Sequence, residues 1–167
     1  MEGLKLILDK LSQYNFMTNM LPGAVLCIAL KYVVGYDLFV STNWLMVGII
    51  FYFVGMINNR FGSLFVEWFL KTCHIVQFAP YGDFVKAEKE DGKITTLNME
   101  NNVFRSYISV CLLAILAWVY KFLCSKWTWL DEQTEWILLV LLLVLFVLSY
   151  RKQTKYVRAR VEANLRN

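Results

Sequence analysis

Histidine is almost absent from this chain, and its scarcity limits the chemistry that the protein can perform. His74 is the only one among 167 residues, and neither an H-x-x-x-H pair nor a carboxylate cluster lies near it. Metal centres and Ser-His-Asp triads therefore have no candidate residues. No glycine-rich phosphate loop precedes a helix either. We predict no catalytic residues, no metal site, no cofactor and no enzymatic activity.

The cysteines form no recognisable framework. They are scattered at positions 27, 73, 111 and 124 without a C-x-x-C motif, and three lie in or beside apolar segments. In such segments a free thiol behaves as a small apolar group. We expect all four to be reduced and structural, in preference to a disulfide framework or a zinc site.

Charged residues are also scarce, at 18% of the chain, whereas hydrophobic residues make up 58%. An average soluble domain has about 25% charged residues. The apolar residues gather in four blocks, which cover residues 16–36, 44–57 with a helical continuation to 70, 103–123 and 136–150. A helix needs about 20 residues to cross a bilayer core. The fourth block is shorter, so we expect Thr134–Glu135 or the tail beyond Tyr150 to extend it.

The blocks predict helices and exclude the strands of a closed β-barrel, which is the other architecture that spans a membrane. Barrel strands alternate apolar and polar residues, whereas residues 137–148 are apolar at every position. We therefore predict an all-α integral membrane protein. It has an N-terminal segment 1–15, four transmembrane helices over 16–150 and a basic helical extension over 151–167. Because segment 1–15 mixes acidic and basic residues, no cleaved signal peptide is expected.

Lysine and arginine are distributed unevenly, and cytoplasmic loops are normally the basic ones. Loop 37–43 has no basic residue, and loop 124–135 has only Lys126. The N-terminus, segment 60–105 and the tail together hold 14 of the 17 basic residues. Tryptophans 44, 127, 129 and 136 fall at the opposite interface, where aromatic belts form. We expect both termini to lie in the cytoplasm.

Two segments outside the blocks also have a predicted structure. Apolar residues in segment 1–15 recur at helical spacing, so we expect an amphipathic helix on the inner membrane surface or under neighbouring subunits. The inner loop 71–102 contains a turn at Pro80–Gly82 and a short helix that Asp83 caps and Gly92 ends. Such a short loop cannot bury a core of its own. It must therefore rest on the tail, the membrane or another subunit.

Three glycines mark one narrow face of the second helix. Gly48, Gly55 and Gly62 recur every seven residues. Small residues let membrane helices approach closely, and a seven-residue repeat suits left-handed packing. The pattern predicts a helix-packing face, either within one chain or between subunits.

Polar residues interrupt the inner end of the same helix, at Asn58, Asn59, Arg60, Ser63 and Glu67. Arg60 lies about 24 Å along this helix from its first residue, close to the inner boundary of a bilayer core. Polar side chains at such a depth are costly and normally face protein or water. One interpretation is that Arg60 extends to the interface and pairs with Glu67. The other is that these residues line a pore or its inner mouth in an oligomer.

Basic side chains also gather on the tail, at Arg151, Lys152, Lys155, Arg158 and Arg160. One interpretation is an anionic-lipid surface on the cytoplasmic side. The other is a site for a phosphate-bearing ligand such as a nucleotide or oligonucleotide. Oligomerisation would strengthen the second, because symmetry brings several copies of the stripe around one axis.

Three stretches together resemble a known family. They are YNFMTNMLPG at 14–23, NRFGSLFVEWFL at 59–70, and FAPYGDFVKAEK at 78–89 with NNVFRS at 101–106. They resemble small multi-span membrane proteins of bacterial anti-phage defence operons, among them the membrane effector of Hailong-type systems. The resemblance implies an oligomeric ion channel in the bacterial inner membrane. It also implies control by a DNA oligomer that a partner nucleotidyltransferase makes.

Together the pattern and the resemblance favour a homo-oligomeric channel, such as a tetramer, or a membrane-disrupting effector. Its expected partners are the lipid bilayer, further copies of itself, and an oligonucleotide or nucleotide signal from the cytoplasm. The alternative is a non-conducting membrane scaffold or accessory subunit that uses the inner loop to dock a cytosolic partner. The residues named above as site candidates rest on the physical pattern and not on the resemblance.

Overall fold

The computed structural model describes residues 13–38 and 43–165, which form helices and no strand. Four helical bodies are long and apolar enough to cross a membrane: Gln13–Val34, Trp44–Thr72, Lys93–Lys126 and Thr134–Leu165. The prediction of an all-helical chain with four candidate spans is thereby confirmed. The predicted amphipathic helix over 1–15 lies almost wholly outside the described residues.

The first body is one continuous helix with π-helical turns at both ends. It consists of η1 (Phe16–Met20), α2 (Leu21–Ala29) and η2 (Leu30–Val34). Pro22 lies inside this continuous helix, directly after the π-helical turn η1, so its missing N–H removes one backbone hydrogen bond from the body. The body ends at Gly35, whose φ of 82° is in the left-handed region that glycine adopts without steric cost.

The second body consists of α3 (Trp44–Phe61), η3 (Gly62–Val66) and α4 (Glu67–Thr72). Asn43 caps it, since its side chain accepts a hydrogen bond from the Leu45 N–H at 3.0 Å. The π-helical turn η3 widens the helix immediately before Glu67. Such turns displace the regular hydrogen bonds and are frequent at functional sites.

The connection between the second and third bodies is shorter than the loop expected over 71–102. Helix α4 runs to Thr72 and α6 (Lys93–Lys126) begins ten residues before position 103, so residues 73–92 make the connection. Helix α5 (Tyr81–Glu90) lies within it and ends before Gly92, as the sequence predicts, but the predicted Asp83 cap is wrong, because Pro80 takes the N-cap position and Asp83 lies in the first turn. Residues 93–102 join α6 because no glycine or proline interrupts them.

The fourth body follows a tight turn. After α7 (Thr128–Glu132), α8 runs unbroken from Thr134 to Leu165. The short fourth apolar block is therefore extended at both ends, as expected. The basic tail up to Leu165 is a continuation of the same helix.

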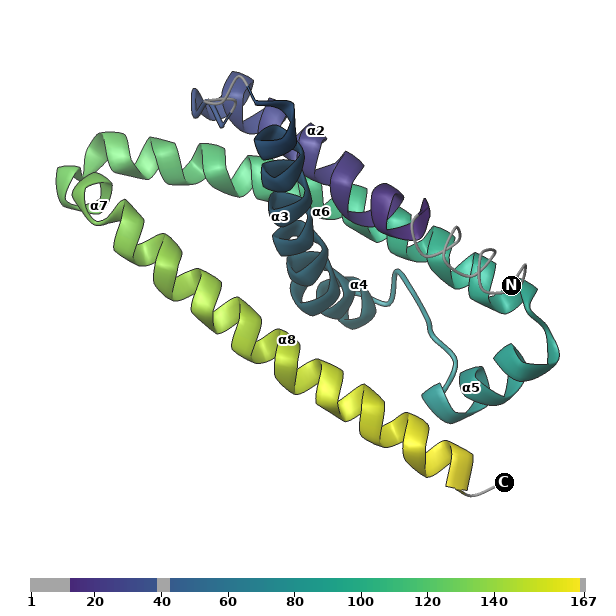
Figure 1. Ribbon diagram of the computed structural model, residues 1–167. Helices are drawn as coiled ribbons and strands as arrows, with labels where there is room; N and C mark the ends of the chain where they lie inside the picture. The colour runs from purple at the N-terminus through teal and green to yellow at the C-terminus, as the bar shows by residue number, and fades with distance from the viewer. Residues whose placement is uncertain (1–12, 39–42, 166–167) are drawn as a thin grey trace.

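Figure 1 shows that α2 runs alongside α6, that α3 lies in front of them, and that α8 diverges from α6 at the α7 turn. Helix α8 contacts α3 and α5, whereas α2, α3 and α6 contact one another. The start of the first body, α4, α5 and the C-terminal half of α8 lie towards one end, which we call the loop end. The opposite end, with α7, is called the hairpin end.

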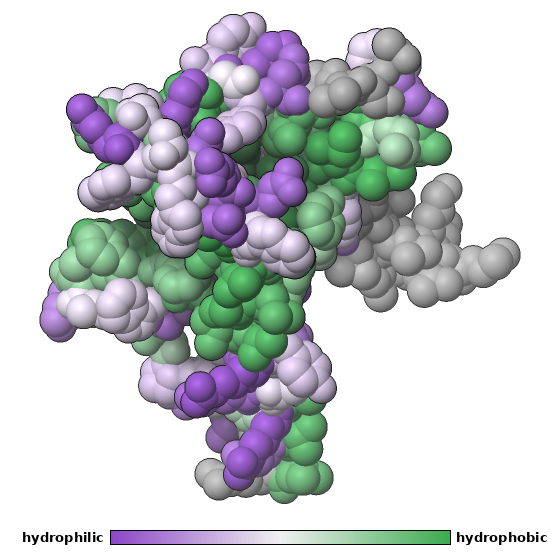
Figure 2. Space-filling view, turned by 90° about the vertical axis from the view of Figure 1, so that its left-hand side faces the viewer, coloured by the Kyte–Doolittle hydropathy of each residue, from purple (hydrophilic) through white to green (hydrophobic). Residues whose placement is uncertain are grey.

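Residues 138–141, near the start of α8, are exposed around the helix. The four consecutive residues Leu138–Leu141 are each more than half exposed, and consecutive residues of a helix point in different directions. Farther along, Figure 2 shows the C-terminal part of α8 at the bottom of the view, with hydrophilic surface beside an apolar strip. The small apolar core, by contrast, lies where α2, α3 and α6 meet, around Leu26, Cys27 and Val110.

Candidate functional site

Glu67 is the centre of a charged cluster at the loop end. Its Oε1 pairs with the Lys71 ammonium at 2.9 Å. Its Oε2 accepts hydrogen bonds from Arg105 Nη1 and from Lys152 Nζ, each at 3.1 Å. Glu67 is buried, with a side chain 10% exposed. One carboxylate therefore holds three cations, which come from α4, α6 and α8.

Hydrogen bonds extend this cluster to the first body. Arg105 Nη2 donates to Asn59 Oδ1 at 3.1 Å, and Asn59 Nδ2 donates to Asn19 Oδ1 at 3.0 Å. Asn19 belongs to η1, so a single chain of polar contacts runs through all four bodies. We call Asn19, Asn59, Glu67, Arg105 and Lys152 the polar network. In an apolar environment such networks favour one arrangement of helices, because breaking a contact leaves a buried polar group unpaired, although the buried Arg105 Nε already lacks a partner among the described residues.

The π-helical turn η3 supplies an additional acceptor to this network. Lys152 Nζ donates to the Ser63 carbonyl oxygen and, at 3.0 Å, to the Ser63 hydroxyl. With Glu67, these acceptors use all three N–H groups of the ammonium. Lys152, predicted among the residues of a ligand or anionic-lipid surface, therefore points into the molecule instead.

Asn58 lies away from any accessible surface of the chain. Its side chain is fully buried and donates to the Ser106 carbonyl oxygen at 3.0 Å. The Ser109 hydroxyl donates to the Asn58 carbonyl oxygen at 2.8 Å. Asn58 thus fastens α3 to α6. Because it is enclosed on all sides by its own chain, its predicted place in a pore lining does not fit this arrangement.

Arg60 does not pair with Glu67, so that interpretation of the sequence is wrong. The Glu67 carboxylate is taken by Lys71, Arg105 and Lys152, and Arg60 has an exposed side chain on another part of α3. Arg60 instead lines a cavity of about 30 Å³ between the second body and α8. The cavity is lined by Arg60, Ser63, Leu64, Ser149, Lys152, Gln153 and Tyr156.

Two of the three predicted packing glycines are in close contact within the chain. A Cβ on Gly55 would lie 1.8 Å from the Asn19 carbonyl oxygen, and one on Gly62 would lie 3.2 Å from the Ser109 Cβ. Gly23, in α2, faces the same contact from the other side, since its Cβ would lie 1.9 Å from the Phe51 carbonyl oxygen. Gly48 is looser, with its nearest neighbour, the Met20 Cε, at 3.9 Å. Gly55 and Gly62 therefore allow packing inside one chain.

The remaining basic residues of the tail divide between two roles. Arg160 pairs with Glu88 at 3.3 Å and so fastens α8 to α5, a contact that the Tyr81 and Tyr156 rings reinforce at 5.2 Å. Three others have exposed side chains: Arg151, Lys155 and Arg158. Of these, Arg158 pairs with Glu162 on the next turn of α8, at 2.7 Å. Arg151, Lys155 and Arg158 thus form an exposed basic stripe along α8.

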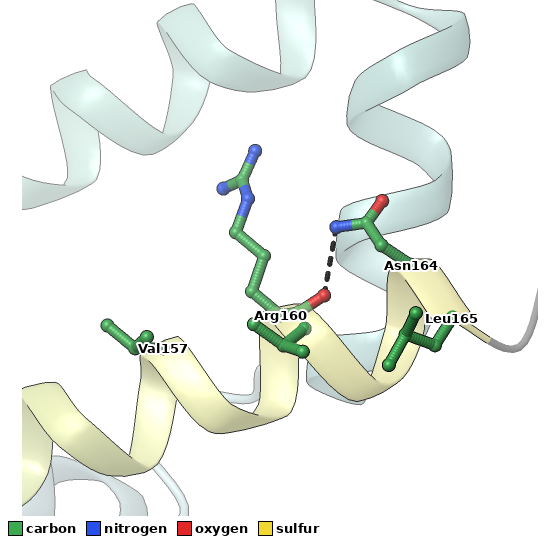
Figure 3. A pocket seen from close by; sticks show the side chains of 5 residues that line it. Val157, Arg160, Asn164 and Leu165 are labelled. Carbon is green, nitrogen blue, oxygen red and sulfur yellow. Dashed lines mark hydrogen bonds between the residues drawn. The ribbon is translucent and has the colours of Figure 1, made fainter.

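A second, shallow depression of about 390 Å³ lies at the end of α8. Figure 3 shows Val157, Arg160, Asn164 and Leu165, with Asn164 donating to the Arg160 carbonyl oxygen at 2.9 Å. All of its lining residues belong to this one helix. The depression is therefore a feature of an exposed helix surface and not a pocket enclosed by several elements.

Sequence reasoning missed three members of this site. Lys71 follows Glu67 by four residues, so helical spacing alone would have found that pair. Asn19 and Arg105 carry no such signal, because they meet their partners 40 and 38 residues away in the sequence. Comparison of the chain with protein-family models, curated proteins and solved structures finds no match.

Proposed function

We propose that the chain is a multi-pass protein of the bacterial inner membrane with both termini in the cytoplasm. It assembles as a homo-oligomer, such as a tetramer, and acts as an ion channel or membrane-disrupting effector in anti-phage defence. The polar network is its inner gate. An oligonucleotide or nucleotide from a partner nucleotidyltransferase controls the channel from the cytoplasm.

The polar network carries this proposal. It lies at the loop end, where the basic residues of the chain gather, and the positive-inside rule assigns that end to the cytoplasm. Ionisable residues within membrane helices are expensive and tend to mark ion paths or other functional sites. Here Glu67, Arg105 and Lys152 lie in three different candidate spans. A shift of any one span must therefore break or rearrange these contacts.

The exposed helices support assembly into an oligomer. Within a single chain, α6 and α8 each have a low share of buried surface along their most apolar stretch. Residues 138–141 of α8 are each more than half exposed in the single chain. Lipid covers part of such a surface, and further copies of the chain cover the remainder in an oligomer. A pore then forms between subunits and not through one chain.

The tail offers a mechanical route from ligand to gate. Arg151 and Lys155 flank Lys152 on the same helix, and they have exposed side chains. A phosphate-bearing ligand bound to them displaces α8. Because α8 carries Lys152, this movement disturbs the contact between Lys152 and Glu67. Such a ligand changes the open fraction only if it binds the open and closed states with different affinity.

Ion flux through proteoliposomes containing the purified full-length protein tests the proposal. We expect flux from the wild type, and loss of that flux in Asn59→Ala or Arg60→Gln while membrane insertion is retained. Arg151→Gln is the matched control, because its side chain faces outward beyond the network; it retains basal flux. A short single-stranded DNA oligomer applied to the loop end changes wild-type flux and has less effect on Arg151→Gln.

Two outcomes would contradict the proposal. A correctly inserted oligomer without any flux, with or without DNA, favours the non-conducting scaffold. If no substitution between residues 58 and 67 alters the flux, the polar network does not belong to the conduction path. The orientation is checked separately by labelling a cysteine introduced as Ser125→Cys, at the hairpin end, with a membrane-impermeant maleimide in intact cells. We expect it to react, whereas Cys73 reacts only after permeabilisation.

A further inference from the structure

The C-terminal part of α8 has two faces, and one of them packs against the rest of its own chain. The partly buried residues of this inner face recur at helical spacing: Lys152, Tyr156, Ala159 and Ala163. Lys152 contacts the second body, and Tyr156 contacts α5. The other face carries an apolar stripe whose members are each more than half exposed: Tyr150, Val157, Val161 and Leu165. At about 100° per residue, the two stripes lie nearly opposite each other, about 160° apart around the helix.

Lipid does not cover this outer stripe in the proposed membrane orientation. Counted from Thr134, a bilayer core of about 20 helical residues ends at about residue 154. Val157, Val161 and Leu165 lie beyond that point, on a stretch of helix with exposed basic side chains beside the apolar strip (Figure 2). Exposed apolar patches with a polar rim mark interaction surfaces.

The spacing of the stripe is that of a coiled coil. Residues 150, 154, 157, 161 and 164 follow one another at alternating steps of four and three, which is the spacing of the d and a positions of a heptad. Val157 then occupies a d position and Val161 an a position, at the centre of the seam. A strict seam of this kind is narrower than the apolar face of a helix on a membrane or a globular core. It indicates that another helix covers the stripe.

The shallow depression at the end of α8 has the lining that such a helix requires. In a coiled coil, one side chain inserts between four residues of the facing helix. Four residues that line the depression are spaced at i, i+3, i+4 and i+7: Val157, Arg160, Val161 and Asn164 (Figure 3). They take the d, g, a and d positions, which together receive an a-position side chain in a parallel pair. In a second copy of the chain, that side chain is Val161.

The charges beside the stripe are compatible with a second copy in parallel orientation. In a parallel pair, each g residue lies beside the following e residue of its neighbour. These pairs are Gln153 with Arg158 and Arg160 with Leu165, and neither joins like charges. An antiparallel pair would instead bring the arginines at the e positions together, which is unfavourable. Copies inserted alike into one membrane are parallel, so topology and charge select the same arrangement.

We propose that residues 150–165 form a parallel coiled coil with the same segment of further copies of the chain, at the cytoplasmic surface of the membrane. This inference rests on the assembly and orientation given under the proposed function, and not on ion conduction. The flanking Arg158 and Arg160 already pair with Glu162 and Glu88, which leaves little charge to attract an acidic helix of another protein. A seam of about two heptads binds weakly by itself, but copies held side by side in one bilayer meet at a high effective concentration.

Disulfide cross-linking of the full-length protein in the membranes of expressing cells tests the seam. The parent variant carries Cys73→Ser, Cys111→Ser and Cys124→Ser, which leaves only the buried Cys27. We expect Val157→Cys and Val161→Cys to form dimers on mild oxidation, because equivalent core positions face one another in a parallel, in-register pair. Lys155→Cys is the matched control. Its position is also exposed but lies outside the seam, so it should cross-link at least about tenfold more slowly.

Val161→Asp measures how much the seam contributes to assembly. When two copies meet, the new carboxylate is buried without a partner, so the concentration of half-dissociation in micelles should rise at least about tenfold. Lys155→Asp introduces the same side chain outside the seam and should stay within about twofold of the wild type. Both positions are exposed in the single chain, so the helical circular dichroism of each monomer should be unchanged.

Three results would overturn the seam. Oligomers that form without cross-links at either 157 or 161 assemble through their membrane spans alone, and the proposed assembly then stands without the seam. Equal cross-linking rates in Lys155→Cys and Val161→Cys indicate random collision. Protection of the tail from trypsin in nanodiscs that depends on phosphatidylglycerol, and not on the number of copies in the disc, assigns the stripe to the membrane surface. Conversely, cross-links at 157 and 161 in a protein without ion flux support the seam and contradict only conduction.

Discussion

The loop end and the hairpin end of the same long helices are held together in different ways. At the loop end, polar contacts connect all four bodies through Lys152, Glu67, Arg105, Asn59 and Asn19. At the hairpin end, α6 and α8 are connected through the short α7 turn, where the Tyr120 hydroxyl lies 2.9 Å from the Thr134 hydroxyl. Beyond that turn the two helices diverge (Figure 1).

This difference shows which forces bring membrane helices together within one chain. Lipid tails are as apolar as leucine, so burying leucine against leucine provides little drive for association. The leucine-rich residues 138–141 of α8 are accordingly more than half exposed, whereas Leu145, farther along, is buried. Close glycine contacts and polar pairs do provide a drive, and the helices meet where those residues lie. Breaking each kind of contact should therefore have effects of different size.

The largest effect is expected from Glu67→Gln. The substitution leaves Lys71, Arg105 and Lys152 without a counter-charge, and removal of one partner from a buried ion pair costs about 3–5 kcal/mol. Reversible unfolding in mixed micelles measures this loss. Glu132→Gln is the matched control at the hairpin end, where the side chain is exposed, and it should be close to neutral. Equal losses in both variants would contradict the distinction between the two ends.

A smaller but still large effect is expected from Gly55→Ala. The new methyl group would lie 1.8 Å from a backbone oxygen of Asn19, so η1 and α3 have to move apart. Overpacking of this kind typically costs about 1–3 kcal/mol. Gly48→Ala adds the same methyl group to the same helix with only a side-chain carbon at 3.9 Å, and should be tolerated. Unfolding curves of the two variants, measured in parallel, compare their free energies of unfolding. If Gly48→Ala lowers this free energy as much as Gly55→Ala, the close contact at Gly55 is not the cause of the loss.

The smallest effect on the isolated chain is expected from Leu139→Ala. This residue is 56% exposed and lies in the exposed stretch 138–141 of α8, so its truncation should change monomer stability by less than about 0.5 kcal/mol. Leu145→Ala, on the same helix but buried, should cost more. Unfolding is measured at protein concentrations below and above the one at which oligomers form. The comparison distinguishes a surface packed within the chain, as at Leu145, from one that contacts another subunit. If Leu139 contacts another subunit, its truncation weakens the oligomer without changing the monomer.

The number and type of elements followed from the sequence because lipid imposes simple requirements. Continuous apolar runs near 20 residues predict helices, and four such runs predict four candidate spans. The extension of the fourth helix at both ends was likewise predictable, because 15 apolar residues are too few to cross a bilayer core. The early start of α6 at Lys93 was not predicted, since its first turns are polar and the hydropathy pattern does not mark them.

The candidate site was predicted less completely. Asn59 and Glu67 were identified because polar residues in an apolar helix stand out. Their partners were not, because Arg105 and Lys152 had an equally good explanation as cytoplasmic basic residues. Only the packing of α6 and α8 against the second body brings them to Glu67. Long-range pairs of this kind depend on how each helix is rotated about its own axis. A single sequence does not specify these rotations.

The unbroken length of α8 gives the molecule the properties of a lever. Lys152 is its pivot, because this residue is anchored to Ser63 and Glu67 of the second body. The arm from the pivot to Thr134 is about 27 Å long, and the arm to Leu165 is about 20 Å, at a rise of about 1.5 Å per residue. A tail displaced by about 2 Å at its end would therefore move the hairpin end by almost 3 Å in the opposite direction, as estimated from the ratio of the two arms. One rigid helix can thus carry a small movement at the loop end to the hairpin end and enlarge it on the way.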